Sequence, residues 1–354
     1  MRKAYEDENF DVIDFSPERA AGGLLYFKGR ERKLDVSMVY GSDAGFVFNE
    51  FGYPVIRESV ENLRRNLPSN KVVIVTGFEG KLVSNGSLKA GARNINDALV
   101  SLLVAALGGR GAGYEIMKDE DYVLSINPNP YGVRGKPVEK LSLDEAVGLT
   151  GSGAEFIHQL TLPITEMFGL EGHIGKTVLS RKSLSTRKNY VVAMHVERYP
   201  MVSALSYLMD TPEYSGVFAD TLGVINSHNF VVLDSSTQSK GFSVSYRPEN
   251  KKDVNGVDIR VAIACQHRKT GRSLKIRQKP AWGITLVGRA MKRRPNTLGE
   301  LCSLAGQNGI SIRMLAHADE EFFFPQITLY FDEKYMPKVL ELYADTLGLR
   351  VNNI

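Results

Sequence analysis

The residues best suited to chemistry lie within 71–128, in an order that fits the handling of phosphate groups. A strand-like run at 71–75 turns at once through the glycine-bearing segment 76–80, and a polar segment carrying Arg93 and Asp97 then leads into an apolar helix. Backbone N–H groups at such a turn or helix start, with a cation nearby, form a natural phosphate site.

Each of these residues also has a purely structural interpretation. Arg93 and Asp97 are four positions apart, so they could form an ordinary surface pair on the helix. Glu18 could simply complement the positive start of its own helix. The acidic turn 119–121 could be solvated, and His158, on a run that we interpret as the apolar helix 152–160, fits a buried core histidine.

The elements that position these residues alternate between strands and helices, which favours a mostly parallel α/β sheet. Ser16 and Pro17 suit the start of a first helix, and Ser142 with Glu145 has the spacing of a capping box. Pro163 is expected to bend or end the helix before it. The expected strands of this part are 34–41, 71–75 and 173–180, and an expected helix is 56–67.

A polar, basic segment at 180–188 is the predicted linker, and the pattern changes after it. The order strand, helix, strand, strand then occurs twice, which predicts two successive ferredoxin-like modules. Gly309 is expected to cap a helix. The expected elements are 189–197, 215–229, 230–234 and 241–247 in the first module, and 283–289, 297–309, 311–316, 325–331 and 334–348 in the second.

Composition excludes several classes of function. The chain has 354 residues, of which 43% are hydrophobic and 24% charged, and this is typical of a soluble protein with two or three domains. A net charge of +4 argues against a dedicated nucleic-acid binder, and the basic runs 267–279 and 289–294 are interpreted as solvated. No run is long and apolar enough to span a membrane.

The cysteines and histidines predict neither disulfides nor a metal site. Cys265 and Cys302 are far apart with no neighbouring histidine, so we interpret both as buried thiols in a reducing compartment. The six histidines lack metal-ligand spacing. Together with an amino terminus that has no signal sequence, this predicts a cytoplasmic protein without a bound metal.

Five motifs, in the right order, resemble those of the aspartokinases. They are VVIVTGFEG (72–80), RNINDALVSLLVAALG (93–108), KDEDYVLSINP (118–128), KLSLDEA with SGAEFIHQLT (140–161), and GITLVGRAMKRRPNTLGELCSLAGQNGISIRML (283–315). The resemblance implies an amino-acid-kinase αβα sandwich followed by two ferredoxin-like (βαββαβ) ACT domains. It places a truncated kinase domain at 1–182 and the ACT domains at 183–256 and 257–354.

The resemblance also implies roles for individual residues. Arg93 and Asp97 match the arginine and aspartate of the family's GRGGSD motif, at the amino-acid and phosphate site. Glu18 is similar to a glutamate near the same substrate. On the nucleotide side the resemblance places Asp119, Asp121 and Asn127. In the first ACT domain, the segment 233–239 resembles an effector loop, with Asp234, Ser235 and Ser236 as acceptors for an ammonium group and Met201 on the opposite wall.

The chain departs from the family where phosphate should approach. It lacks the amino-terminal KFGGTS motif, whose lysine bridges the phosphoryl groups, so the match is to an amino-terminally truncated and degenerate member. Asn94 and Ile95 replace the two glycines of GRGGSD, and Tyr122 replaces a third glycine. A β-branched residue resists positive φ and crowds the approach of a phosphate. Phosphoryl transfer depends on such positioning, so these changes predict impaired catalysis.

Two functions follow from this resemblance. The first is a non-catalytic homologue that regulates, senses an amino acid or acts as a scaffold, pairing with itself through its ACT domains or with a full-length kinase. The second is an active aspartate 4-kinase, which would require ATP and Mg²⁺. The truncation would leave a sheet edge and apolar surface to be covered by the acidic leader or by another chain. Neither function predicts nucleic acid or a membrane as a partner.

Overall fold

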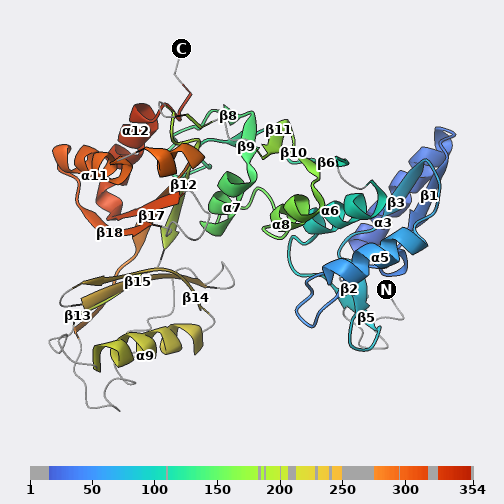
Figure 1. Ribbon diagram of the computed structural model, residues 1–354, viewed down its shortest axis with the longest axis horizontal. Coiled ribbons are helices and arrows are strands. Elements are labelled where there is room, and N and C mark those ends of the chain that lie inside the picture. Colours follow the sequence, from blue (N-terminus) through green and yellow to red (C-terminus); the bar gives the residue numbers. More distant parts are fainter. Residues whose placement is uncertain are drawn as a thin grey trace. The chain divides into compact units, whose positions relative to one another are not determined.

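The computed structural model describes residues 16–108, 111–181, 185–186, 189–199, 201–205, 213–227, 230–238, 241–248, 275–294, 296–317 and 326–351. The chain is an α/β protein, as predicted, and it divides into two compact units (Figure 1). One unit contains Met1–Asp121 and Glu155–Ser180, and the other contains Tyr122–Ala154 and Arg181–Ile354.

The first unit is built on short parallel strand pairs. Strand β1 (Val36–Val39) runs parallel to β3 (Val72–Val75), with Val36 opposite Val72. Strand β2 (Val47–Phe48) is parallel to β4 (Glu79–Leu82), which pairs with β5 (Leu88–Ala90). Strand β6 (Gly113–Ile116) is parallel to β10 (Glu171–Ile174), which turns back into β11 (Thr177–Ser180). The helices of this unit are α3 (Ser16–Glu31), α4 (Gly41–Ala44), α5 (Ile56–Asn66), α6 (Asn96–Leu107) and α8 (Thr161–Phe168).

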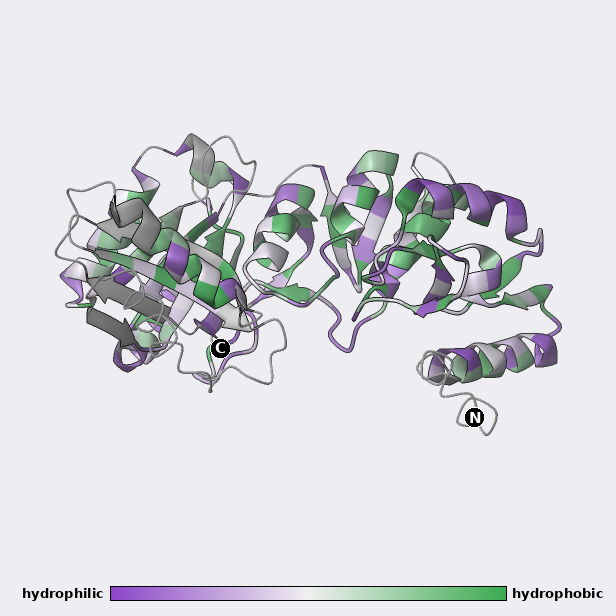
Figure 2. Cartoon of the chain, turned by 90° about the horizontal axis from the view of Figure 1, so that it is seen from below, coloured by the Kyte–Doolittle hydropathy of each residue, from purple (hydrophilic) through white to green (hydrophobic). Residues whose placement is uncertain are grey.

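Helix α3 lies on the β1–β3 pair through two glycines. A Cβ at Gly22 would lie 3.0 Å from the methyl carbon of Met38, and one at Gly29 would lie 3.1 Å from Val36. Hydrophobic and hydrophilic residues mix along the helix that follows the N-terminus (Figure 2). Leu24, Leu25 and Phe27 are all exposed. The helix is therefore held by its small residues and leaves large apolar side chains uncovered in this chain.

The described residues of the second unit form two four-stranded antiparallel sheets. The first sheet has the order β14-β15-β13-β16 and the second the order β12-β17-β19-β18. The strands of the first are β13 (Met201–Leu205), β14 (Phe230–Gln238), β15 (Gly241–Pro248) and β16 (Lys275–Gln278), with helix α9 (Glu213–Ser227). Those of the second are β12 (Ala193–Tyr199), β17 (Ala281–Val287), β18 (Ile312–His317) and β19 (Gln326–Phe331), with helices α11 (Thr297–Gln307) and α12 (Met336–Thr346).

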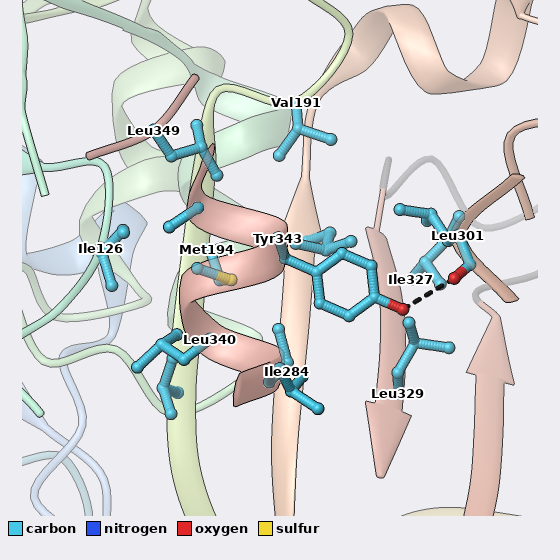
Figure 3. Close-up of a cluster of buried hydrophobic side chains, with 14 of the residues drawn as sticks. Ile126, Val191, Met194, Ile284, Leu301, Ile327, Leu329, Leu340, Tyr343 and Leu349 are labelled. Carbon is cyan, nitrogen blue, oxygen red and sulfur yellow. Dashed lines mark hydrogen bonds between the residues drawn. The ribbon is translucent and has the colours of Figure 1, made fainter. Parts of the chain in front are cut away.

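The remaining elements of this unit are short. They are β7 (Val123–Leu124), β8 (Pro137–Val138), β9 (Lys140–Ser142), α7 (Leu143–Gly151) and the 3₁₀ turns η2 (Arg289–Arg293) and η3 (Glu333–Tyr335). The second sheet packs its apolar face against α11 and α12 (Figure 3). At the centre of this core the fully buried Tyr343 donates a 2.8 Å hydrogen bond to the Leu301 carbonyl, so its hydroxyl is satisfied.

The pairing of strands corrects the predicted order of the modules. Strand β12, expected in the first module, pairs along its whole length with β17 of the second, with Ala193 opposite Val287 and Tyr199 opposite Ala281. Strand β16 pairs with β13, so it belongs to the first sheet. The first module is therefore inserted between two neighbouring strands of the second, and the modules are nested rather than successive.

Three local predictions are also wrong. Residues 152–160 form turns rather than a helix, and Pro163 lies in the first turn of α8, where a missing N–H is tolerated. The expected strand 173–180 is a hairpin, because Gly175 adopts φ +52° between β10 and β11. The segment 233–239, expected as a loop, is mostly strand β14.

Two capping predictions are confirmed. The Ser142 side chain accepts from the Glu145 N–H, and the Glu145 carboxylate accepts from the Ser142 N–H, which completes the capping box of α7. Gly309 follows α11 with φ +68°, the left-handed conformation expected of a glycine after a helix. Both signals are local in sequence, which explains why they could be predicted.

Candidate functional site

The candidate site of the first unit is formed by two loops that touch. One is the segment 76–80, in which the turn after β3 leads into the first residues of β4, and the other is the segment 91–97, in which a loop leads into the first residues of α6. The Gly91 N–H donates a 2.9 Å hydrogen bond to the Phe78 carbonyl. A Cβ at Gly77 would lie only 2.4 Å from the amide oxygen of Asn96, so no other residue fits there without displacing Asn96. Ligands of open α/β sheets bind at this end of parallel strands.

The first loop directs a carboxylate inward. Glu79 is fully buried, and its Oε2 accepts two hydrogen bonds from Arg19 of α3, from Nη2 at 2.5 Å and from Nε at 3.1 Å. Its Oε1 accepts from the Thr76 hydroxyl and, at 3.3 Å, from the Gly41 N–H. A buried carboxylate needs such a full set of donors, because burial without them is costly. The Arg19 guanidinium also stacks on the Tyr40 ring at 4.4 Å.

Sequence reasoning missed both members of this pair. The available signal was an acid in the turn of TGFEG, directly after an apolar strand, and an arginine in the first turn of the first helix. Neither residue matched a motif position for which a role was expected. Their pairing joins residues 60 positions apart, so it could not be derived from local spacing.

The second loop corrects the prediction about its lost glycines. The left-handed residue is Asn94, with φ +61°, and asparagine tolerates this conformation better than most residues. Ile95 has φ −64°, an ordinary value for a β-branched residue, so its side chain does not strain the backbone. Its side chain is fully buried, and a Cβ at Gly91 would lie 2.6 Å from its Cγ2. Ile95 thus fills the loop from inside.

Asp97 lies in the first turn of α6 and pairs with Lys118 rather than with Arg93. Its carboxylate is 3.2 Å from Lys118 Nζ and accepts a 3.0 Å hydrogen bond from the His158 N–H. The side chain of Asp97 is 14% exposed and that of Lys118 is 34% exposed, so the pair lies near solvent. Arg93 is exposed and makes no hydrogen bond or ion pair with the residues that the structure describes. The structural interpretation of an Arg93–Asp97 pair is therefore wrong.

His158 lies in the turn before α8, beside Asp97. Burial lowers the pKa of His158, and the Asp97 carboxylate partly opposes this effect. Its Nδ1 accepts a 3.2 Å hydrogen bond from the Leu160 N–H, which requires that nitrogen to be unprotonated. The Tyr53 ring lies beside it, with centroids 6.4 Å apart. The site therefore combines a neutral imidazole, a carboxylate and an ammonium group.

Comparisons with known proteins agree on one family. A scan against models of protein families gives no match. The aspartokinase of Bacillus sp. (strain MGA3) is 18% identical over 342 residues, which cover 94% of this chain and 80% of the relative. Aspartokinase 3 of Arabidopsis thaliana is 34% identical, over 26% of this chain and 16% of the relative. The aspartate kinase structure from Clostridium acetobutylicum covers 95% of this chain and 75% of its own, with 15% identity and a TM-score of 0.77.

The chain is an aspartokinase homologue. Its fold also matches E. coli aspartokinase III solved with aspartate and ADP, with a TM-score of 0.67, 16% identity, and coverage of 94% of this chain and 74% of that one. The same enzyme solved with lysine and aspartate gives a TM-score of 0.65 and 15% identity over 90% of this chain and 71% of that one.

The other residues predicted to bind substrate or nucleotide do not form one cluster with Arg93 and Asp97. Glu18 lies in α3, where its Oε2 is buried without a hydrogen-bond partner among the described residues. Asp119 and Asp121 are exposed, and Asp121 pairs with Lys176 at 2.5 Å. Asn127 uses its amide to hold the backbone of β12, donating to the Val196 carbonyl at 2.9 Å and accepting from the Val196 N–H at 2.7 Å. That commitment favours a structural role for Asn127.

The predicted effector residues share one sheet of the second unit. Met201 on β13 and Asp234 on β14 are both opposite Ser245 on the strand between them, so the three residues form a row. Ser235 and Ser236 follow on β14, and a register shift lies between Val232 and Asp234. The Ser245 hydroxyl is 3.0 Å from the Tyr330 hydroxyl of the second sheet. The backbone thus brings residues from two predicted walls into one row.

The described part of the chain shows neither a metal-binding cluster nor a membrane-spanning helix. It contains no group of three or more His, Cys, Asp or Glu side chains that could hold a metal ion. None of its helices combines the length and apolar character needed to cross a membrane. Cys302 is half-buried, and burial raises the pKa of its thiol, whereas Cys265 and the basic residues 267–274 lie outside the described residues.

Proposed function

We propose that this aspartokinase homologue is a non-catalytic, amino-acid-sensing regulator. The observation that carries the proposal is the filled loop at the start of α6. Ile95 is fully buried there, and the Asn96 side chain occupies the space above Gly77. The resemblance expects two glycines in this loop, which would let a phosphate approach the backbone N–H groups. Side chains in that space oppose such an approach.

The charges of the loop support the same proposal. Asp97, the acid of the matched motif, accepts from both Lys118 and the His158 N–H. The second carboxylate of the site, Glu79, is enclosed by its own donors. A phosphoryl-transfer site works by aiming unsatisfied positive groups at developing negative charge. Asp97 and Glu79 instead add negative charge to this site, and each accepts hydrogen bonds from donors that would otherwise be available to a phosphate.

The sensing role rests on the first sheet of the second unit. By the resemblance, Asp234, Ser235 and Ser236 would offer acceptors to an ammonium group, and the backbone pairing puts Met201 in the same row as Asp234. An amino acid is the ligand class that this set fits, and E. coli aspartokinase III has been solved with lysine and aspartate. We further propose that the homologue forms a homodimer through its ACT-like modules or pairs with a full-length kinase.

A coupled assay of ADP release tests the catalytic part of the proposal. Pure protein with ATP, Mg²⁺ and aspartate is expected to give no aspartate-dependent ADP release above the protein-free blank. Arg93→Ala is the matched variant, because Arg93 is exposed and its loss should leave the fold intact. Aspartate-dependent turnover that disappears in Arg93→Ala would sink the proposal.

Differential scanning fluorimetry with each of the twenty amino acids tests the sensing part. A ligand that binds the native state raises the unfolding midpoint. We expect at least one amino acid to raise it, and expect Asp234→Ala with Ser236→Ala to abolish the rise. Asp119→Ala, an exposed acid of the other unit, is the control that should keep it. If no amino acid shifts the midpoint, the sensing role is wrong.

The alternative function is an active ATP-dependent aspartate 4-kinase. It is favoured by Arg93, whose guanidinium is exposed beside the start of α6 and has no partner among the described residues. It predicts that ATP or ADP with Mg²⁺ binds, which isothermal titration measures directly. The absence of any nucleotide affinity at high protein concentration would remove this alternative.

A further inference from the structure

The donors around Glu79 form a receptor with the shape of a carboxylate. The two carboxylate oxygens have separate donors. Arg19 serves Oε2, while Oε1 accepts from the Thr76 hydroxyl and, at 3.3 Å, from the Gly41 N–H, which also donates to Thr76 Oγ1 at 3.0 Å. These donors come from three segments of the chain. Arg19 lies in α3, Thr76 directly follows β3, and Gly41 is the first residue of α4. The Glu79 side chain, which these donors surround, is fully buried. A charged group with two satisfied oxygens is what such a set recognises.

We propose that this is a carboxylate-binding site which the chain fills with its own Glu79. The side chain acts as an internal ligand, and an external carboxylate binds to the same donors when Glu79 is withdrawn or removed. The ligand class is a small carboxylic acid, including the carboxylate of an amino acid. The proposal stands apart from the effector row of the second unit and does not depend on the absence of catalysis.

The backbone of the turn supports a ligand role over simple packing. Phe78, directly before Glu79, has φ +60°, a conformation that is an outlier for a bulky side chain. Strained residues of this kind concentrate at ligand sites, where the surrounding structure holds them in place. Gly41 has no room for a side chain, because a Cβ there would lie 2.6 Å from both the Thr76 and the Glu79 carbonyl oxygens. The turn is therefore held in a shape that presents Glu79 to the donors.

The site also has a side that reaches solvent. The Arg19 side chain is 28% exposed although its partner is fully buried, and Tyr40, on which it stacks, is 40% exposed. A small acid could therefore reach Arg19 from that side. Donors grouped around two oxygens fit a carboxylate better than a phosphate, which offers three equivalent oxygens to donors.

Glu79→Ala tests the proposal because it removes the internal ligand and leaves all three donors. Its unfolding midpoint is measured against rising acetate or formate, with potassium chloride keeping the ionic strength constant. We expect acetate to raise the midpoint of Glu79→Ala in a saturable way and to leave that of the wild-type protein unchanged. Inorganic phosphate at equal ionic strength is the second arm, and it should raise the midpoint less than acetate.

Two further variants identify the donors. Glu79→Gln keeps the space filled with an uncharged side chain, so acetate should have no effect on it. Adding Arg19→Ala to Glu79→Ala removes the charged donor, and acetate affinity should fall about tenfold or more, as expected for a lost charged hydrogen bond. If Glu79→Ala does not fold in chloride, its refolding yield from urea is measured in acetate, and recovery of the fold there supports the site.

Three results would overturn the proposal. Glu79→Ala could respond to acetate no more than the wild type or Glu79→Gln does, which would leave the pair a structural ion pair. The response could survive the loss of Arg19, which would place the acetate elsewhere. Phosphate could stabilise Glu79→Ala more than acetate does, which would make the assigned ligand class wrong.

Discussion

The two loops of the first unit are alike in design and differ in burial. Each contains a non-glycine residue in the left-handed conformation, Phe78 at φ +60° and Asn94 at φ +61°. Each presents an acid, paired with a base from another segment. Glu79 is fully buried with Arg19, whereas Asp97 remains near solvent with Lys118.

This difference in burial decides what each pair can do. An ion pair near solvent contributes little to stability and can exchange its partner for a ligand, because water competes for both groups throughout. A buried pair is costly to break, because the remaining charge has no other solvation. The Arg19–Glu79 pair therefore stabilises its loop, and an external carboxylate can reach its donors only when Glu79 is withdrawn or removed. The Asp97–Lys118 pair can exchange partners at little cost.

The largest expected effect comes from breaking the buried pair. Arg19→Ala leaves the Glu79 carboxylate buried without a countercharge, and we expect it to lower the free energy of unfolding by about 3–5 kcal/mol. Lys118→Ala, the matched change in the other loop, should cost about 1 kcal/mol or less. Amide hydrogen exchange across 72–82 measures the local effect separately from the second unit. Equal losses for both variants would erase the distinction between the loops.

The second prediction concerns the buried side chain of the more exposed loop. Ile95→Ala creates a cavity beside Gly91 and should cost about 2–5 kcal/mol, whereas Ile95→Val should cost about 0.5–1.5 kcal/mol. Urea denaturation followed by exchange in α6 measures both. A loss below about 0.5 kcal/mol for Ile95→Ala would mean that the loop is open rather than packed, and would weaken the case against phosphate binding.

The third prediction separates the two left-handed residues. Asn94→Ala should cost about 1–2 kcal/mol, since alanine lacks the tolerance of asparagine for positive φ. Asn94→Gly should be neutral or stabilising, and Phe78→Gly should relieve backbone strain at the expense of Phe78 packing. Thermal unfolding of the three variants gives the ranking. A stable Asn94→Ala would show that the loop rearranges easily.

The smallest expected effect is the pH dependence that His158 adds to the Asp97 loop. Burial lowers the pKa of His158 from its ordinary value of 6.5, so this contribution to stability is present above pH 6.5 and is lost as pH falls through the lower, folded pKa. Asp97→Asn removes the opposing carboxylate, so it should lower the pKa further and steepen the loss. His158→Gln should flatten the profile between pH 7.5 and about pH 5, a range chosen to span the ordinary histidine pKa. Urea midpoints across that range measure it.

The sequence was sufficient for features that depend on neighbouring residues. The capping box of Ser142 and Glu145 needs only a spacing of three, and β3 and α6 follow from the order of apolar residues. The aspartokinase resemblance could be predicted because its motifs occur in order along the chain, and the sequence and structure relatives confirm it. The predicted boundary of the kinase-like part at residue 182 stays a prediction.

Features that join distant segments could not be predicted. The nested order of the sheets depends on which strand pairs with β12, and β12 pairs with β17, which follows the whole first module in the sequence. The Arg19–Glu79 pair depends on the packing of α3 against β1 and β3, which Gly22 and Gly29 allow by their small size. Pro163 misled because proline is disfavoured inside a helix but accepted in its first turn, and only the real start of α8 distinguishes the two.

The nesting of the two sheets bears on the order in which the chain can fold. Tyr199 and Ala281 are opposite each other in the second sheet although about 80 positions separate them, and closing so long a loop carries an entropic cost. The inserted module begins and ends with β13 and β16, which pair with Val202 opposite Gln278. Once that pair has formed, Tyr199 and Ala281 are already neighbours and the long loop is closed. We therefore expect the inserted module to fold first and to bring β12 and β17 together, so that the second sheet forms after it.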